Sequence, residues 1–209
     1  MKGIIICNGI AEDYNTIKCA GADLIVCADG GADHAYKAGI VPHCIIGDLD
    51  SISDEARAYF ESKGVEFSKY PKDKDETDTH LAINYCIAHG CDDITLYAAL
   101  GGRFDHAFAN VSLLAMLKQR GISACIVDGD SALYVSDDEL KISGKQGDLL
   151  SLLPLGDGVT ILFTDGLYYA VKDRKFPFGY PFGVSNVFTG SEALIRMSGG
   201  WLLAVHTAL

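Results

Sequence analysis

Two aspartates follow a short apolar run, at the point where a buried strand should end. The segment PHCIIGDLDSIS, residues 42–53, places Asp48 and Asp50 directly after the run CII and a glycine. In an extended segment, side chains two residues apart point the same way, so the two carboxylates should converge. Converging carboxylates need a cation, and oxygen ligands favour a hard ion such as Mg²⁺. The pair therefore predicts a magnesium site.

Polar residues also follow the other apolar runs that should form strands. In an open parallel sheet, ligands bind beyond the carboxyl ends of the strands, so these residues should meet at one rim. They are Asn8 and Gly9 after the first run, Asp29, Gly30 and Gly31 after the second, Lys72, Lys74, Asp75, Thr77 and Asp78 after the fourth, and Arg103, Asp105 and His106 after the fifth.

The glycines and cations at this rim suit a magnesium-bound polyphosphate. The glycine pairs 30–31 and 101–102 each join a strand to a helix, where glycine lets a ligand approach the backbone and helix N–H groups attract an anion. Arg103, Lys72 and Lys74 supply positive charge for phosphate oxygens. Neither a Walker-type phosphate loop nor a dinucleotide fingerprint occurs in the sequence.

Each acid also has a structural interpretation. Asp50 and Ser51 suit a cap for the helix that begins near residue 53, which leaves the first aspartate of the pair unexplained. Asp78 and Asp105 extend apolar helix faces at their N-terminal ends, where negative charge is favourable in any case. Asp29 before two glycines suits a turn, and the lysines suit solvated loops.

The elements that would position these residues change in character near residue 128. Before that point, continuous apolar runs alternate with amphipathic stretches, which predicts a three-layer α/β domain with a mainly parallel sheet over residues 1–128. The expected strands are 3–7, 24–28, 43–46, 65–69, 93–98 and 122–127, and the expected helices are 11–20, 31–39, 53–63, 76–89 and 104–119.

Residues 129–209 read as short strands separated by hairpin turns. Asp-Asp, Gly-Lys, Gly-Asp-Gly and Asp-Gly breaks predict a C-terminal antiparallel β-sandwich. The segment KFPFGYPFGVSN, residues 175–186, is too apolar for a plain linker, so we expect it to pack on something.

Composition excludes several classes of partner. The formal net charge of −11 argues against nucleic acid and membrane surfaces, which both reward a basic face. Seven cysteines, an odd number without any CxxC pair, predict reduced thiols in a cytoplasmic protein. The N-terminal apolar stretch is too short for a signal peptide, and no run is long enough to span a membrane.

The segments ADGGAD, IIGDLDS, KDETDTHLA, GGRFDHAFANVSLL and a late VSN resemble, in this order, those of thiamine pyrophosphokinases. The resemblance spans roughly residues 1 to 205. It implies an N-terminal catalytic domain that binds ATP and Mg²⁺, a C-terminal sandwich that binds thiamine, and a homodimer. It also implies transfer of the pyrophosphoryl group of MgATP to the hydroxyl of thiamine, with release of AMP.

The resemblance assigns roles to individual residues. It implies metal ligands at Asp48, Asp50 and Asp78, with Arg103 and Asp105 completing the catalytic set. It implies nucleotide contacts from Asp29, Gly30, Gly31, Ser51, Lys74, Asp75, Thr77 and His106. It implies thiamine contacts from Ser185 and Asn186, with Phe188 as the aromatic that stacks on thiamine and Trp201 as a second choice. The first loop, CNGIAED, departs from the family, which often has a more glycine-rich turn there.

Two other functions fit parts of the pattern. A phosphatase of the haloacid-dehalogenase type would use Asp48 as a nucleophile. That class usually has the motif on its first strand and a threonine where this chain has Ile52. A sensor would bind metal, nucleotide or thiamine without turnover, but so many acids beside Arg103 exceed what binding requires.

Overall fold

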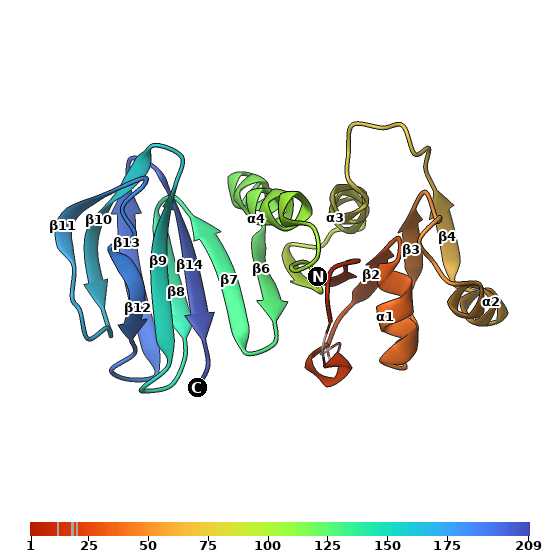
Figure 1. Ribbon diagram of the computed structural model, residues 1–209, viewed down its shortest axis with the longest axis horizontal. Coiled ribbons are helices and arrows are strands. Elements are labelled where there is room, and N and C mark those ends of the chain that lie inside the picture. The colour runs from red at the N-terminus through yellow and green to blue at the C-terminus, as the bar shows by residue number, and fades with distance from the viewer. Residues whose placement is uncertain (12, 18, 20) are drawn as a thin grey trace. The chain divides into compact units, whose positions relative to one another are not determined.

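The chain divides into two units, Met1–Gly129 and Asp130–Leu209, in a computed structural model that describes residues 1–11, 13–17, 19 and 21–209 (Figure 1). The seven cysteines are all free, in line with the expected reduced thiols, and Cys19 and Cys125 are the half-buried ones. Within the described ranges, no helix is long and apolar enough to cross a membrane.

Unit 1 is built on a parallel sheet whose strands lie in the order β6-β5-β1-β2-β3-β4. The apolar runs form the strands because both faces are covered, with α1 and α2 on one face and α3 and α4 on the other (Figure 1). The strands are β1 Lys2–Ile6, β2 Leu24–Ala28, β3 Cys44–Gly47, β4 Glu66–Lys69, β5 Asp93–Tyr97 and β6 Ser123–Asp128, and the helices are α1 Gly31–Lys37, α2 Asp54–Ser62, α3 Asp78–Ala88 and α4 Phe104–Gln119.

These elements confirm the predicted α/β architecture, with one exception. The expected helix over 11–20 is wrong: the described part of this segment holds only a 3₁₀ turn, η1 Tyr14–Thr16. Asp13 accepts a hydrogen bond from the Asn15 N–H (2.9 Å), and such a side-chain bond competes with helix formation. Residues 12, 18 and 20 of the expected helix lie outside the described ranges.

Unit 2 is the predicted antiparallel β-sandwich. Its strands β12-β9-β14-β7 lie side by side in one layer, and the sheet β11-β10-β13-β8 forms the other. Alternate residues of each strand face a shared core; in β9, for example, Leu150 and Leu152 are buried and their neighbours are half-buried. The strands are β7 Ser131–Ser136, β8 Glu139–Ser143, β9 Leu149–Leu155, β10 Gly158–Asp165, β11 Lys172–Pro177, β12 Gly183–Val187, β13 Glu192–Ser198 and β14 Trp201–Thr207.

We expected the aromatic segment 175–186 to pack against other residues, and only part of it does. Phe176 at the end of β11 is buried in the sandwich core. The turn between β11 and β12, however, leaves Phe178, Tyr180 and Phe182 more than half exposed. These rings therefore form an apolar surface on unit 2.

Phe188 is part of the sandwich core. Its side chain is 1% exposed, and its ring centroid lies 5.1 Å from that of His206. A ring that is covered in this way has no free face for a ligand, so we correct the expectation that Phe188 stacks on thiamine.

Replacing Phe188 with alanine should therefore act on stability. Loss of a buried phenyl ring leaves a cavity, and we expect the free energy of unfolding to fall by about 3–5 kcal/mol. Denaturant unfolding followed by circular dichroism measures the change. The variant Phe178→Ala, which truncates an exposed ring, is the matched control and should unfold like the unaltered protein; equal stability of both variants would contradict the burial of Phe188.

Candidate active site

The carboxyl ends of β1, β2, β3 and β5 open into a cavity of about 680 Å³ in unit 1. The strand order reverses here, because β1 pairs with β2 on one side and with β5 on the other. Open parallel sheets bind ligands at such switch points. The cavity is lined, among other residues, by Asn8, Gly9, Asp29, Asp48, Asp50, Ser51, Lys72, Lys74, Thr77, Asp78, Arg103 and His106.

Three carboxylates converge in this cavity. Asp29, Asp48 and Asp78 each offer an oxygen, and these oxygens lie within 4.8 Å of one another. Asp29 is 5% exposed, and within the described structure its Oδ1 is buried without a hydrogen-bond partner. A buried, unpaired carboxylate oxygen beside two others fits a divalent cation, and an all-oxygen donor set favours Mg²⁺. We call these three residues the acidic cluster.

The backbone at Gly47 makes room for the acidic cluster. Its φ is +151°, and a Cβ there would lie 2.9 Å from Asp29 Cβ and 3.1 Å from Asp78 Cγ. Asp29 itself has a φ of +47°, a conformation that costs energy in most residues but that aspartate tolerates. A glycine and a left-handed aspartate therefore bring the cluster together at the ends of β2 and β3.

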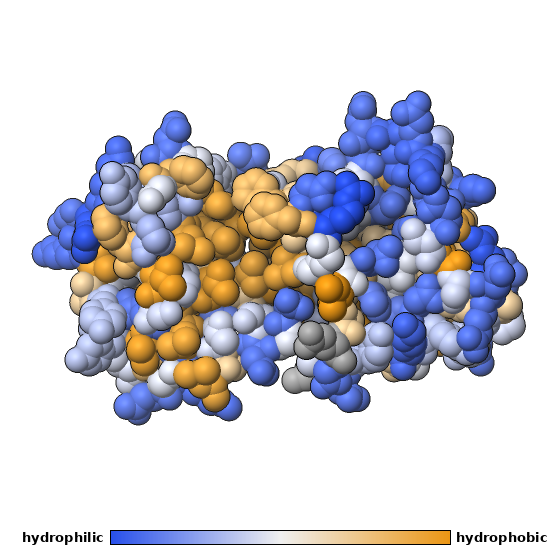
Figure 2. Space-filling view, in the orientation of Figure 1, coloured by the Kyte–Doolittle hydropathy of each residue, from blue (hydrophilic) through white to orange (hydrophobic). Residues whose placement is uncertain are grey.

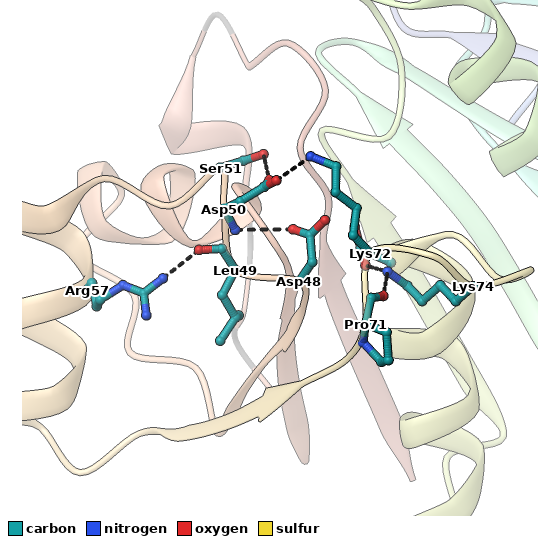
Figure 3. A network of polar contacts seen from close by, with 9 residues as sticks. Asp48, Leu49, Asp50, Ser51, Arg57, Pro71, Lys72 and Lys74 are labelled. Atoms are coloured by element: carbon teal, nitrogen blue, oxygen red, sulfur yellow. Dashed lines mark hydrogen bonds and ion pairs between the residues drawn. The ribbon is translucent and has the colours of Figure 1, made fainter.

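Asp50 does not join the acidic cluster, so the predicted convergence of Asp48 and Asp50 is wrong. Leu49 between them has a φ of +66°, and the segment is therefore not extended. The Asp50 N–H donates to Asp48 Oδ1 (3.1 Å), while the Asp50 carboxylate pairs with Lys72 Nζ (2.6 Å), as Figure 3 shows. Lys72 lowers the pKa of Asp50 through this hydrogen bond.

The capping interpretation of Asp50 and Ser51 is also wrong. Ser53 caps α2 itself, because its hydroxyl accepts from the Ala56 N–H (3.3 Å). Ser51 Oγ instead donates to Asp50 Oδ1 (3.2 Å) (Figure 3). Asp50 and Ser51 thus bond to each other and line the cavity.

The cations reach the cavity from two loops. Lys74, in the hydrophilic loop that follows β4 (Figure 2, upper right), lies with Nζ 3.0 Å from Asp78 Oδ1. Arg103 lines the cavity and forms an exposed pair with Asp105 (Nη2 to Oδ2, 2.6 Å). That hydrogen bond lowers the pKa of Asp105 to about 2. Asp105 therefore stands beside Arg103, apart from the acidic cluster.

Several expected nucleotide contacts have structural roles. Thr77 caps α3 by accepting from the His80 N–H (3.2 Å). A Cβ at Gly31 would lie 2.1 Å from the Ile6 carbonyl oxygen, so this glycine permits close packing of α1 on β1. A Cβ at Gly30 would likewise meet the side chain of Asn8. Asp75 is exposed and is not part of the cavity lining as the described residues define it.

Sequence reasoning missed two residues that hold the cavity loops. Arg57 on α2 donates from Nη2 to the Leu49 carbonyl oxygen and so anchors the loop of Asp48 (Figure 3). Asn110 on α4 is buried and donates from Nδ2 to the Ala99 carbonyl oxygen (2.8 Å). The sequence could have indicated Asn110, because it is an amide side chain within an apolar helix. It gave no sign of the role of Arg57, because a surface arginine on a helix is ordinary.

Unit 2 has a separate cavity of about 730 Å³. Ser185, which has a φ of +57°, lines it together with Arg174 and Phe182. Tyr168 and Tyr169 also line it and are 70% and 63% exposed, although the sequence did not single them out. This cavity offers exposed aromatic faces beside a serine.

Asn186 is buried and holds one of these tyrosines. Its Oδ1 accepts from the Tyr169 N–H (2.9 Å), and its Nδ2 donates to the Tyr169 carbonyl oxygen (2.8 Å). Because both ends of the amide are used, Asn186 positions the backbone of Tyr169.

Two sequence profiles match the chain. The profile described as "Thiamin pyrophosphokinase, catalytic domain" matches residues 18–126, and "Thiamin pyrophosphokinase, vitamin B1 binding domain" matches residues 138–202. Thiamine pyrophosphokinase 1 of Oryza sativa subsp. japonica is 27% identical over 203 residues, which cover 85% of this chain and 75% of that protein. Thiamine pyrophosphokinase of Bacillus subtilis (strain 168) is 25% identical over 181 residues, or 86% and 85% of the two chains.

Solved structures share the fold. The crystal structure of thiamine pyrophosphokinase from Bacillus subtilis has a TM-score of 0.87 at 23% identity, covering 100% of both chains. The crystal structure of yeast thiamin pyrophosphokinase has a TM-score of 0.84 at 19% identity, covering 100% of this chain and 86% of that one. Both units therefore have known structural counterparts.

Asp29→Asn should stabilise the metal-free protein at neutral pH. Burial raises the pKa of Asp29, and the charges of Asp78 and Asp48 add to this. A folded-state pKa above the unfolded value gives stability that is full at low pH and is lost as pH rises through that pKa. At pH 7 with EDTA, we expect the variant to melt roughly 2–4 °C higher, which corresponds to about 1 kcal/mol.

The gain should vanish near pH 4, where Asp29 binds a proton more readily than an ordinary aspartate. Asp50→Asn is the matched control, because that carboxylate is paired with Lys72 and has a lowered pKa. A gain in Asp50→Asn as large as in Asp29→Asn, or none in either, would show that the acidic cluster is not electrostatically strained.

Proposed function

The chain belongs to the thiamin pyrophosphokinase family, and on this premise we propose that it transfers the pyrophosphoryl group of ATP, bound as a magnesium complex, to the hydroxyl of thiamine. The products are thiamine diphosphate and AMP. The observation that carries the proposal is the acidic cluster, because three converging carboxylates beside Lys74 and Arg103 offer both signs of charge that a magnesium triphosphate requires.

The residues of the unit 1 cavity fall into two groups, one that suits the metal and one that suits the phosphates. Asp29, Asp48 and Asp78 would hold Mg²⁺, which supplies charge neutralisation on the triphosphate. Lys72, Lys74 and Arg103 face the same cavity and suit the phosphate oxygens. Transfer of this kind depends on positioning and charge more than on a covalent nucleophile. It therefore requires no activated serine or cysteine.

In the transfer itself, the thiamine oxygen forms a bond to the β-phosphorus of ATP. The bond between that phosphorus and the oxygen bridging to the α-phosphorus breaks, and AMP leaves with the bridging oxygen. The hydroxyl proton passes to a carboxylate at the cavity. Arg57 acts indirectly, because its hydrogen bond to the Leu49 carbonyl fixes the loop that presents Asp48.

Thiamine fits the cavity of unit 2. The residues that line it fall within the segment matched by the vitamin B1 binding profile. Thiamine carries a positive thiazolium ring, which the faces of Tyr168 and Tyr169 would attract. Ser185 suits a polar contact, and Asn186 contributes by holding Tyr169 in place.

Self-association as a homodimer is part of the proposal. Large aromatic side chains are exposed on both units: Phe104 and Phe108 stack on α4, and Tyr180 and Phe182 stack on the turn after β11. Clustered exposed aromatics mark interaction surfaces, and a second copy of the chain is the partner that the family resemblance implies. The free thiols support a reducing compartment, the cytoplasm.

The phosphatase alternative has no support from the site. That class places its nucleophilic aspartate on the first strand, whereas Asp48 follows β3. The sensor alternative predicts binding without turnover, which a product assay resolves.

Incubation with ATP, MgCl₂ and thiamine should yield AMP and thiamine diphosphate in equal amounts, measured by liquid chromatography. Asp48→Asn should lower kcat at least 100-fold with an unchanged circular dichroism spectrum, because removal of one carboxylate weakens the hold on the metal-bound phosphates. Asp54→Asn, an exposed acid on α2, is the matched control and should retain activity. ADP as the product would indicate a monophosphate kinase, and binding of both ligands without AMP would indicate a sensor.

Ser185→Ala should raise KM for thiamine about 2- to 10-fold, the effect of one lost hydrogen bond, with less change in KM for ATP. Steady-state kinetics with each substrate varied in turn separates the two constants. Ser191→Ala, at an exposed turn of the same unit, should leave both constants unchanged. A change in KM for ATP alone would contradict the assignment of thiamine to unit 2.

A further inference from the structure

Lys74 lies inside the site as a partner of the acidic cluster. Its side chain is 12% exposed, and its Nζ lies 3.0 Å from Asp78 Oδ1. The same Nζ donates to the Pro71 carbonyl oxygen (3.0 Å), as Figure 3 shows. Lys72, two residues earlier, is 80% exposed and pairs with Asp50, outside the acidic cluster. The two lysines of one loop therefore occupy different electrostatic positions.

The contact between Lys74 and Asp78 is incomplete. Asp78 Oδ1 is buried and, within the described structure, makes no hydrogen bond. The ammonium of Lys74 beside it therefore forms an ion pair with this oxygen but no hydrogen bond. Asp29 Oδ1 in the same cluster also lacks a hydrogen-bond partner there. One ammonium thus offsets part of the charge of three carboxylates, and it satisfies neither buried oxygen fully.

We propose that Lys74 is a resident counter-ion, which occupies Asp78 in the unliganded protein and must leave it when a divalent cation enters the acidic cluster. The inference rests on the proposed function, since it requires the cluster to bind such a cation. A lysine ammonium and a divalent cation repel each other, so the two compete for Asp78 Oδ1. The lysine is then free to contact the phosphates that arrive with the metal.

The Pro71 contact keeps the Lys74 ammonium at the cavity during this exchange. Because the Pro71 carbonyl oxygen also accepts from Nζ, loss of the Asp78 contact leaves the ammonium tethered at the cavity. The stem of Lys74 is largely covered, which limits the positions that the side chain can take. Magnesium loading and phosphate capture would therefore be coupled through one side chain, and Mg²⁺ alone should bind more weakly than Mg²⁺ with a nucleotide.

Calorimetric titration with MgCl₂ alone tests the counter-ion role without any turnover. In Lys74→Met, which keeps the length of the stem, we expect Mg²⁺ to bind about tenfold more tightly than in the unaltered protein, because no ammonium has to be displaced. Lys72→Met removes an equal charge from the same loop and measures the general electrostatic effect, which should be about threefold or less. Lys74→Arg keeps a cation beside Asp78 and should bind Mg²⁺ as weakly as the unaltered protein.

The second arm uses the magnesium complex of a non-hydrolysable ATP analogue. Its affinity should fall in Lys74→Met, opposite in direction to the change for Mg²⁺ alone, because the phosphates lose an ammonium. If the methionine variant misfolds by circular dichroism, Lys74→Gln replaces it in both titrations.

Equal Mg²⁺ affinity in Lys74→Met and Lys72→Met would overturn the counter-ion role. An assay of AMP formation by the unaltered protein distinguishes this failure from a failure of the proposed function. If AMP forms but the affinities are equal, only the role of Lys74 fails. If no AMP forms and none of the proteins binds Mg²⁺, the metal site and the inference fail together.

Discussion

The repulsion among three carboxylates is the constraint on which the unit 1 site depends. Asp29, Asp48 and Asp78 come from separate loops and helix starts, yet the sheet brings their oxygens within 4.8 Å. The fold allows this only because Gly47 has no side chain between Asp29 and Asp78. Burial first, and then the charges of Asp78 and Asp48, raise the pKa of Asp29, so its ionised form is disfavoured without a cation. The fold thus keeps a charge distribution that a divalent ion would relieve.

The surrounding residues hold this unfavourable arrangement in place. Arg57 fixes the loop of Asp48 through its backbone, while Lys72 draws Asp50 away and Lys74 faces Asp78. Unit 2 shows the same division between residues that contact a ligand and residues that position them. There Asn186 bonds both ends of its amide to the backbone of Tyr169, whose ring is exposed. In both units, some polar groups position the groups that line the cavity.

The sequence predicted the positions of the acids along the chain better than the directions of their side chains. Apolar runs ending in Asp29 and Asp48 located the rim, because strand ends follow from hydrophobic pattern alone. The direction of Asp50 depended on the φ of Leu49, for which a leucine gives no signal. Phe188 was misplaced because an aromatic residue at the end of a strand suits a core and a binding site equally well. The identity of the substrates came from the resemblance to a family, since residue types indicate a magnesium polyphosphate but do not indicate thiamine.

The most direct test of the acidic cluster is an anomalous difference map from a crystal of the protein soaked in MnCl₂, where Mn²⁺ replaces Mg²⁺. The account predicts a peak bounded by the carboxylates of Asp29, Asp48 and Asp78. A peak at Asp50 or Asp105 with none among these three carboxylates would contradict it.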